Sequence, residues 1–154
     1  MRLQTEIWLP ASQNEVFAFF ARAENLQALT PDWLHFRILT GLPVDLRLGT
    51  IIDYRIRIHG VPLSWQSEIS VWNPPHSFVD EQRRGPYKRW IHTHRFAEER
   101  GGTRVRDEVD FAVPGGFLAA PFVTRDLRRI FAHRHHSLGQ VFPGGEAGDI
   151  KMFG

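Results

Sequence analysis

The sequence predicts a single α+β domain in which one long C-terminal helix packs into a curved antiparallel sheet. The chain has 154 residues, which suits one domain rather than two. Most of it consists of short segments that alternate apolar and polar residues and are separated by Gly, Pro and Asn, as antiparallel strands are. A single long segment near the C-terminus carries apolar residues at helical spacing instead.

The chain begins with a strand and two short helices. Residues 2–9 alternate in polarity and form the expected first strand. Ser12, with Glu15 three residues later, has the pattern of a capping box and predicts the start of a helix. A second short helical segment, 24–29, ends before Pro31.

Six further strands follow, which gives a seven-stranded antiparallel sheet. We expect them at residues 35–40, 50–59, 63–72, 77–82, 88–97 and 103–113. The turn at 99–102 closes a hairpin between the last two. An antiparallel sheet can bury one face only where something covers it, and the long helix is the candidate cover.

The long helix is predicted over residues 121–141, and Pro143 with the two glycines after it ends the helix. We expect residues 143–154 to be a flexible C-terminal tail, so that the domain spans residues 1–142.

Composition excludes several kinds of function. The chain has no cysteine, which excludes disulfides, thiolate catalysis and Cys-ligated zinc. A charge at Arg2 and short apolar runs argue against a secretion signal and against stable membrane insertion, so we expect a cytoplasmic protein, monomeric or homodimeric. Basic and acidic residues are interspersed and the net charge is +2, so no nucleic-acid partner is expected.

The residue pattern resembles a known superfamily. The order of elements is similar to the helix-grip fold of START lipid-transfer domains, birch-pollen-allergen-like plant proteins and bacterial polyketide cyclase-like proteins (the SRPBCC superfamily). A bacterial subgroup with the pattern GPYxxWxHxHxF is resembled more closely, through residues 78–82, 85–87, 90–96, 102–107 and 130–134. The likeness covers residues 2–142 and implies an internal apolar cavity between sheet and helix. It implies no particular reaction, because a fold does not fix a function.

One predicted strand carries the residues of greatest functional interest. Trp90, His92, His94 and Phe96 share a face at the period of a strand. The turn at 99–102 allows a register with the pairs Phe96–Val105, His94–Asp107, His92–Val109 and Trp90–Phe111. Because most of these partners are apolar, this is the inward face.

The preceding turn brings further polar residues to the same face. The turn at Gly85-Pro86 allows Gln82 to lie by Trp90, Asp80 by His92 and Phe78 by His94. We therefore expect five polar residues together on the concave face: Asp80, Gln82, His92, His94 and Asp107.

Four interpretations of this polar group are open. It can be a satisfied network within a core, since buried polar groups need partners. It can orient a ligand at the base of an apolar pocket. His92 or His94, oriented by Asp80 or Asp107, can serve as acid and base in cyclase-like catalysis. Finally, His-x-His with an aspartate can bind a metal, but no fourth ligand is evident, and we assign neither metal nor cofactor.

Binding is the expected function, with catalysis as the alternative. No Gly-x-Ser-x-Gly elbow and no Gly-rich phosphate loop is present. Arg134 lies on the apolar stripe of the long helix, where it needs either an ion pair with Asp107 or Asp80 or a ligand. His133, His135 and His136 are expected on the surface.

The expected partner is a small hydrophobic or lipid-like molecule. The candidate ligand-binding residues are Tyr54, Trp65, Gln82, Trp90, His92, His94, Phe96, Asp107, Phe111, Phe131, Arg134 and Leu138. Of these, Tyr54 and Trp65 are expected near the mouth of the cavity, where Phe117 is a further candidate.

Overall fold

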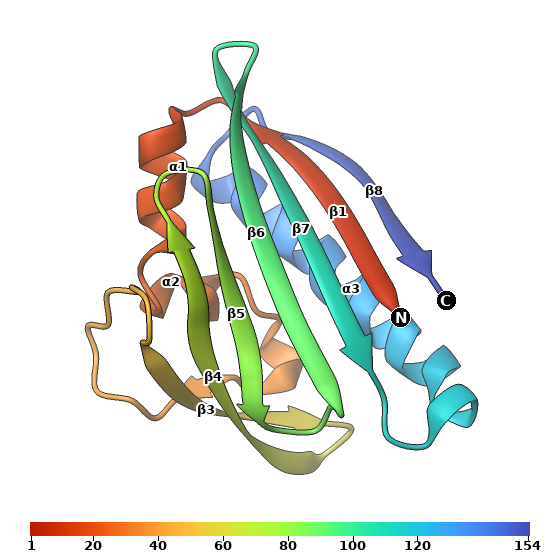
Figure 1. The fold of residues 1–154 in the computed structure, drawn as a ribbon. Coiled ribbons are helices and arrows are strands. Elements are labelled where there is room, and N and C mark those ends of the chain that lie inside the picture. Colours follow the sequence, from red (N-terminus) through yellow and green to blue (C-terminus); the bar gives the residue numbers. More distant parts are fainter.

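The computed structural model describes residues 1–154 except for the side chain of Phe117. One antiparallel sheet wraps around a long helix, α3, which crosses behind β6, β7 and β1 (Figure 1). The strands are β1 (Arg2–Leu9), β2 (Arg37–Ile38), β3 (Ile51–Ile58), β4 (Val61–Asn73), β5 (Ser77–Arg84), β6 (Arg89–Glu99), β7 (Gly102–Ala112) and β8 (Glu146–Phe153). The helices are α1 (Gln13–Phe20), α2 (Glu24–Ala28), α3 (Ala120–Val141) and the short 3-10 helices η1 (Asp32–Leu34) and η2 (Gly116–Leu118).

The α+β prediction is confirmed, with eight strands in place of seven. Their order across the sheet is β2-β3-β4-β5-β6-β7-β1-β8, so the first strand in sequence lies between the last two, β7 and β8. The expected strand at 35–40 is reduced to Arg37–Ile38, since His35 adopts a left-handed conformation with φ of 48°. Such a conformation ends an extended segment.

The additional strand replaces the expected flexible tail. Residues 146–153 form β8, which pairs antiparallel with β1 from Arg2–Phe153 to Trp8–Glu146. The expectation of a loose tail was wrong because only Ile150, Met152 and Phe153 of this segment are large and apolar, and its pairing depends on the free edge of a strand far away in sequence. Arg128 of α3 also donates to the carbonyl oxygen of Ile150 at 2.9 Å, which ties β8 to the helix.

Local sequence accounts for the elements that lead to the cavity. In β1 the inward residues are buried in strict alternation with the outward ones. Ser12 caps α1 as predicted, because its hydroxyl accepts from the backbone N–H of Glu15 at 3.2 Å. The buried face of α1, which includes Phe17 and Phe20, then packs against one end of the concave face of the sheet.

Side chains between sheet and helices form two separate core clusters. The first surrounds α1, where the ring of Phe17 contacts those of Trp72, Phe78 and Phe96. The second lies under the N-terminal half of α3 and contains Leu3, Val109, Phe111, Leu127 and Phe131. The candidate site lies between them. Among the described helices, none combines the length and the apolar character that a membrane span requires.

Candidate functional site

A cavity of about 170 Å³ lies between the concave face of the sheet and the helices. Aromatic rings form much of its wall: Tyr54 and Trp65 stack with centroids 5.5 Å apart, and Trp90 meets Trp65 edge-on at 5.3 Å. Phe131 of α3 lines the side across from the sheet. These four residues were among the candidate ligand-binding residues, and all four line the cavity.

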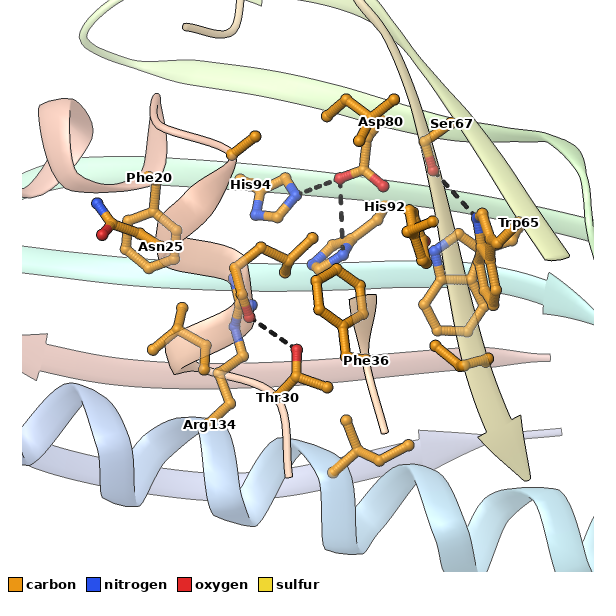
Figure 2. A pocket seen from close by; sticks show the side chains of 18 of the residues that line it. Phe20, Asn25, Thr30, Phe36, Trp65, Ser67, Asp80, His92, His94 and Arg134 are labelled. Atoms are coloured by element: carbon orange, nitrogen blue, oxygen red, sulfur yellow. Dashed lines mark hydrogen bonds and ion pairs between the residues drawn. The ribbon is translucent and has the colours of Figure 1, made fainter. Parts of the chain in front are cut away.

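A part of the wall was missed by the sequence analysis. The segment from the end of α1 to β2 contributes Phe20, Asn25, Thr30 and Phe36, which Figure 2 shows around the same space. Its apolar residues Leu26, Leu29, Leu34 and Phe36 were the available signal. They follow no regular period, so sequence alone did not show that the segment folds over the cavity.

Several expected cavity residues belong to the packed core instead. Phe96 and Leu138 lie in the cluster around α1, and Phe111 lies in the cluster under α3. An inward-facing position on a strand is therefore not enough to predict a cavity residue. Helices pack against the ends of the strands, and the cavity lies only over their middle. The expectation for Phe117 concerns a side chain outside the described part of the structure.

The predicted register of the central strands is confirmed. In β6 and β7, Phe96 pairs with Val105, His94 with Asp107, His92 with Val109 and Trp90 with Phe111. In β5 and β6, Asp80 pairs with His92 and Phe78 with His94.

Gln82 has a different role from the one expected. The described β5–β6 pairs end at Glu81–Ile91, before Gln82 reaches Trp90. Its side-chain amide donates to the Tyr87 carbonyl oxygen at 2.7 Å and accepts from the Tyr87 N–H at 3.1 Å. Gln82 therefore closes the turn between β5 and β6 rather than facing the cavity.

The strand register and α3 together assemble a network of two aspartates, two histidines and an arginine, in which Asp80 is half-buried and the others are buried. We call it the polar cluster: Asp80, His92, His94, Asp107 and Arg134. His92 Nε2 lies 2.8 Å from Asp107 Oδ1, and His94 Nε2 lies 2.6 Å from Asp80 Oδ2. Arg134 reaches in from α3, and its Nη2 lies 3.4 Å from Asp107 Oδ1. Asp80, His92, His94 and Arg134 line the cavity (Figure 2). Asp107 is buried and is not part of the cavity lining.

The cluster shifts the pKa values of the two histidines in opposite directions. Burial lowers the pKa of His92 and the neighbouring charge of His94 lowers it further, so His92 favours its neutral form. Burial also acts against a charge on His94, but the hydrogen bonds and charges of Asp107 and Asp80 outweigh it and raise the pKa of His94. His94 is thus the histidine that favours the proton.

Both aspartates are held in the charged form. Burial would raise the pKa of Asp107, but the Arg134 charge and the bonds from both histidines outweigh it and keep that pKa well below its ordinary value. For Asp80, the hydrogen bond from His94 and the nearby positive charges likewise outweigh burial and lower the pKa. Two negative and two positive groups therefore balance within the cluster.

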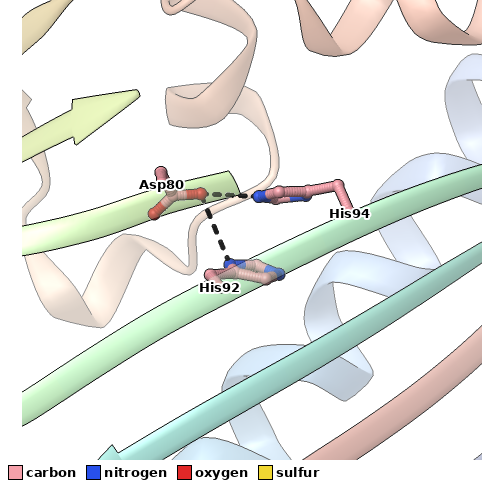
Figure 3. A group of neighbouring side chains, drawn as sticks. All are labelled: Asp80, His92 and His94. Carbon is pink, nitrogen blue, oxygen red and sulfur yellow. Dashed lines mark hydrogen bonds and ion pairs between the residues drawn. The ribbon is translucent and has the colours of Figure 1, made fainter. Parts of the chain in front are cut away.

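Ligand atoms of Asp80, His92 and His94 lie within 4.8 Å of one another (Figure 3). The imidazole rings, however, stack with centroids 3.7 Å apart and planes 25° apart. A metal binds in the plane of each imidazole at about 2.0–2.1 Å, so a position in the plane of one ring lies off the plane of the other. This geometry fits a hydrogen-bonded network better than a metal site.

One of the three histidines expected at the surface is buried. His135 has 7% exposure, and burial lowers its pKa. α3 packs against β1 and also against β8, which the sequence analysis did not expect as a strand. His136 is exposed and His133 is half-buried.

Fold and site together define an α+β protein of the helix-grip type with a mostly apolar cavity between sheet and helices. The family model described as polyketide cyclase / dehydrase and lipid transport matches residues 9–135. The chain therefore belongs to this family, as the resemblance of its motifs implied.

Comparison with solved structures supports the same fold. Protein Ms6760 from Mycobacterium smegmatis is 17% identical, with a TM-score of 0.68 over 91% of this chain and 89% of that one. CV1439 from Chromobacterium violaceum is 13% identical, with a TM-score of 0.69 over 92% and 96%. Major latex-like protein 151 from Panax ginseng is 10% identical, with a TM-score of 0.67 over 93% and 97%. A search among curated proteins found no match.

Proposed function

We propose that this protein binds a small hydrophobic molecule in the cavity between the sheet and α3. The main observation in support is a cavity of about 170 Å³, walled by aromatic and aliphatic side chains, with the polar cluster at its inner side. Ligand sites commonly combine a mostly apolar wall with a few convergent polar groups. The family description, which includes lipid transport, supports this proposal.

The apolar wall supplies affinity and the polar cluster supplies orientation. Burial of apolar surface contributes about 25 cal/mol for each Å² removed from water, so rings such as Trp65 and Trp90 favour an apolar ligand. Asp80 and Arg134 face the same space with hydrogen-bonding groups. A ligand with one polar end would therefore adopt a defined orientation.

A second candidate function is acid–base catalysis of the cyclase or dehydratase kind. The supporting observation concerns His92, which borders the cavity and favours its neutral form. Its Nε2 lies 2.8 Å from Asp107 Oδ1, which orients the ring as a general base requires. Its other nitrogen, Nδ1, lies 3.8 Å from Asp80 Oδ2. Because both nitrogens face carboxylates, we favour the binding function over catalysis.

Two neighbouring residues of β3 provide a test of the binding site. Ile52 is buried in the cavity wall, whereas Ile51 points outward and is 38% exposed. We expect Ile52→Trp to fill the cavity and to weaken binding of a hydrophobic molecule by at least about tenfold, and Ile51→Trp to leave it unchanged.

The measurement combines native mass spectrometry of the purified protein, which detects a co-purifying molecule, with a titration of acetophenone or isopropylbenzene followed by NMR. Equal binding by both variants and the parent would place the ligand elsewhere. A parent protein that neither carries nor binds such a molecule would refute the proposed function.

A further inference from the structure

We infer that the cavity selects an uncharged compound of about one substituted ring, with an oxygen acceptor at its inner end, and discriminates against a carboxylate of the same shape. The inference deepens the proposed function and rests on it. Its basis is the charge balance of the polar cluster, the hydrogen-bonding state of Arg134 and the size of the cavity.

The charges at the inner side of the cavity already compensate one another. Asp80 and Asp107 face His94, which favours its protonated form, and Asp107 also faces the guanidinium of Arg134. An additional carboxylate would bring an uncompensated charge into a buried site, close to the carboxylate of Asp80. Burial of an unpaired charge is strongly unfavourable, whereas a neutral oxygen leaves the balance intact.

Arg134 nevertheless needs a hydrogen-bond acceptor. Its guanidinium carries five N–H donors, and the residue is 5% exposed. The contact of Nη2 with Asp107 is long at 3.4 Å, and among the described groups Nε has no partner. The guanidinium also lies over the ring of Phe20, 5.1 Å from its centroid, which holds it at the cavity wall without satisfying its donors.

A carbonyl or hydroxyl oxygen of a ligand would satisfy this requirement. Buried polar groups without partners cost free energy, and a hydrogen bond to a charged group is among the stronger ones in proteins. Arg134 lines the cavity beside Asp80, whose Oδ2 is already engaged by His94 at 2.6 Å. Arg134, which lines the cavity with donors that the described groups leave unsatisfied, therefore favours an acceptor on the ligand.

The size of the cavity sets the size of the ligand. An engineered cavity of about 150 Å³ in another protein holds benzene, so about 170 Å³ suits a single ring with a few further atoms. A long acyl chain or a fused multi-ring lipid would require the wall to move. Residues 22–36 form a part of the wall that contains only the short helices α2 and η1.

Three ligands of nearly identical shape test the selectivity: acetophenone with a neutral oxygen, benzoate with a charge, and isopropylbenzene with neither. Dissociation constants are measured by NMR titration of the full chain at neutral pH. We expect acetophenone to bind at least about tenfold more tightly than each of the other two. Benzoate or isopropylbenzene binding as tightly as acetophenone would overturn the inference and leave the proposed function standing. If all three fail to bind, the inference is refuted, and the proposed function falls with it when native mass spectrometry also finds no co-purifying molecule.

Variants of Arg134 assign the preference to this residue. Arg134→Met should reduce the advantage of acetophenone over isopropylbenzene to less than about threefold, because the donor to the oxygen is gone. Arg125→Met, an exposed position of the same helix, should preserve it.

If Arg134→Met does not fold, the same two dissociation constants are measured with Arg134→Lys, which keeps the charge but loses the planar set of donors. The advantage of acetophenone should then shrink. A preference that is undiminished in the folded variants would overturn the role of Arg134.

Discussion

The buried carboxylate of Asp107 faces three groups at once: His92, His94 and Arg134. Thr5 adds a hydroxyl 3.4 Å from its other oxygen. Such a network stabilises the fold only while each member keeps its partner, because removing one group leaves a buried charge uncompensated. The protonation of the two histidines is therefore the measurable property of this cluster.

The raised pKa of His94 predicts a pH-dependent contribution to stability. Below the ordinary value of 6.5, the histidine is protonated in the folded and unfolded states, and the full stabilisation is present. As pH rises, the unfolded chain loses this proton first, so the stabilisation decreases until the pH passes the folded pKa. We expect the difference in free energy of unfolding between the parent and His94→Gln to be largest below pH 6.5 and to shrink above it.

Urea unfolding at a series of pH values measures this difference. His136→Gln, an exposed change on α3, is the control and should give a difference that varies little with pH. A difference that grows as pH rises through neutrality would contradict the assignment of the proton to His94.

Replacement of His92 distinguishes binding from catalysis. If His92 orients a ligand or satisfies Asp107, His92→Gln should fold and change ligand affinity by no more than about 1–3 kcal/mol. If it is a general base, turnover should fall by roughly 10²–10⁴-fold while binding is nearly intact. Calorimetry of the identified ligand, with mass analysis of the ligand after incubation, separates the two. We expect the ligand to be recovered unchanged from both proteins.

Among the elements, the central strands were predictable and the last strand was not. The pairs of β5, β6 and β7 follow from alternation along each strand and from short turns that fix the register. β8 has a weak apolar pattern, and its pairing with β1 spans most of the chain. The cavity wall between α1 and β2 was missed for a similar reason, because tertiary packing rather than local periodicity positions it.

The position of β8 predicts the effect of removing it. A chain ending at Gly145 would expose the edge of β1 and remove the acceptor that Ile150 offers to Arg128. Lost hydrogen bonds and packing are offset in part by the freedom of the released segment, so we expect a loss of about 2–4 kcal/mol. Urea unfolding measures it, with a chain lacking only Gly154 as the control. An unchanged transition midpoint would show that β8 contributes no stability.

At the scale of the whole molecule, the cavity exists because the two core clusters do not fill all of the space between the sheet and the helices. The cluster around α1 and the cluster under α3 occupy opposite ends of the concave face. The polar cluster lies between them, so its charges are shielded from water on both sides. The general architecture was predictable from the order of elements, but which inward residues meet the cavity depended on where each core ends.

The place of β1 in the sheet also bears on how the protein is made. Within this sheet β1 comes first in sequence, yet its two neighbours, β7 and β8, come last. During synthesis β1 therefore lacks both hydrogen-bonding partners until the strands farthest from it in sequence have been made, and closing so long a loop is slow. The β3–β6 meander can pair as it emerges, since its strands are neighbours in sequence. Completion of the sheet, and with it the closure of the cavity by α3, thus follows the pairing of β3–β6.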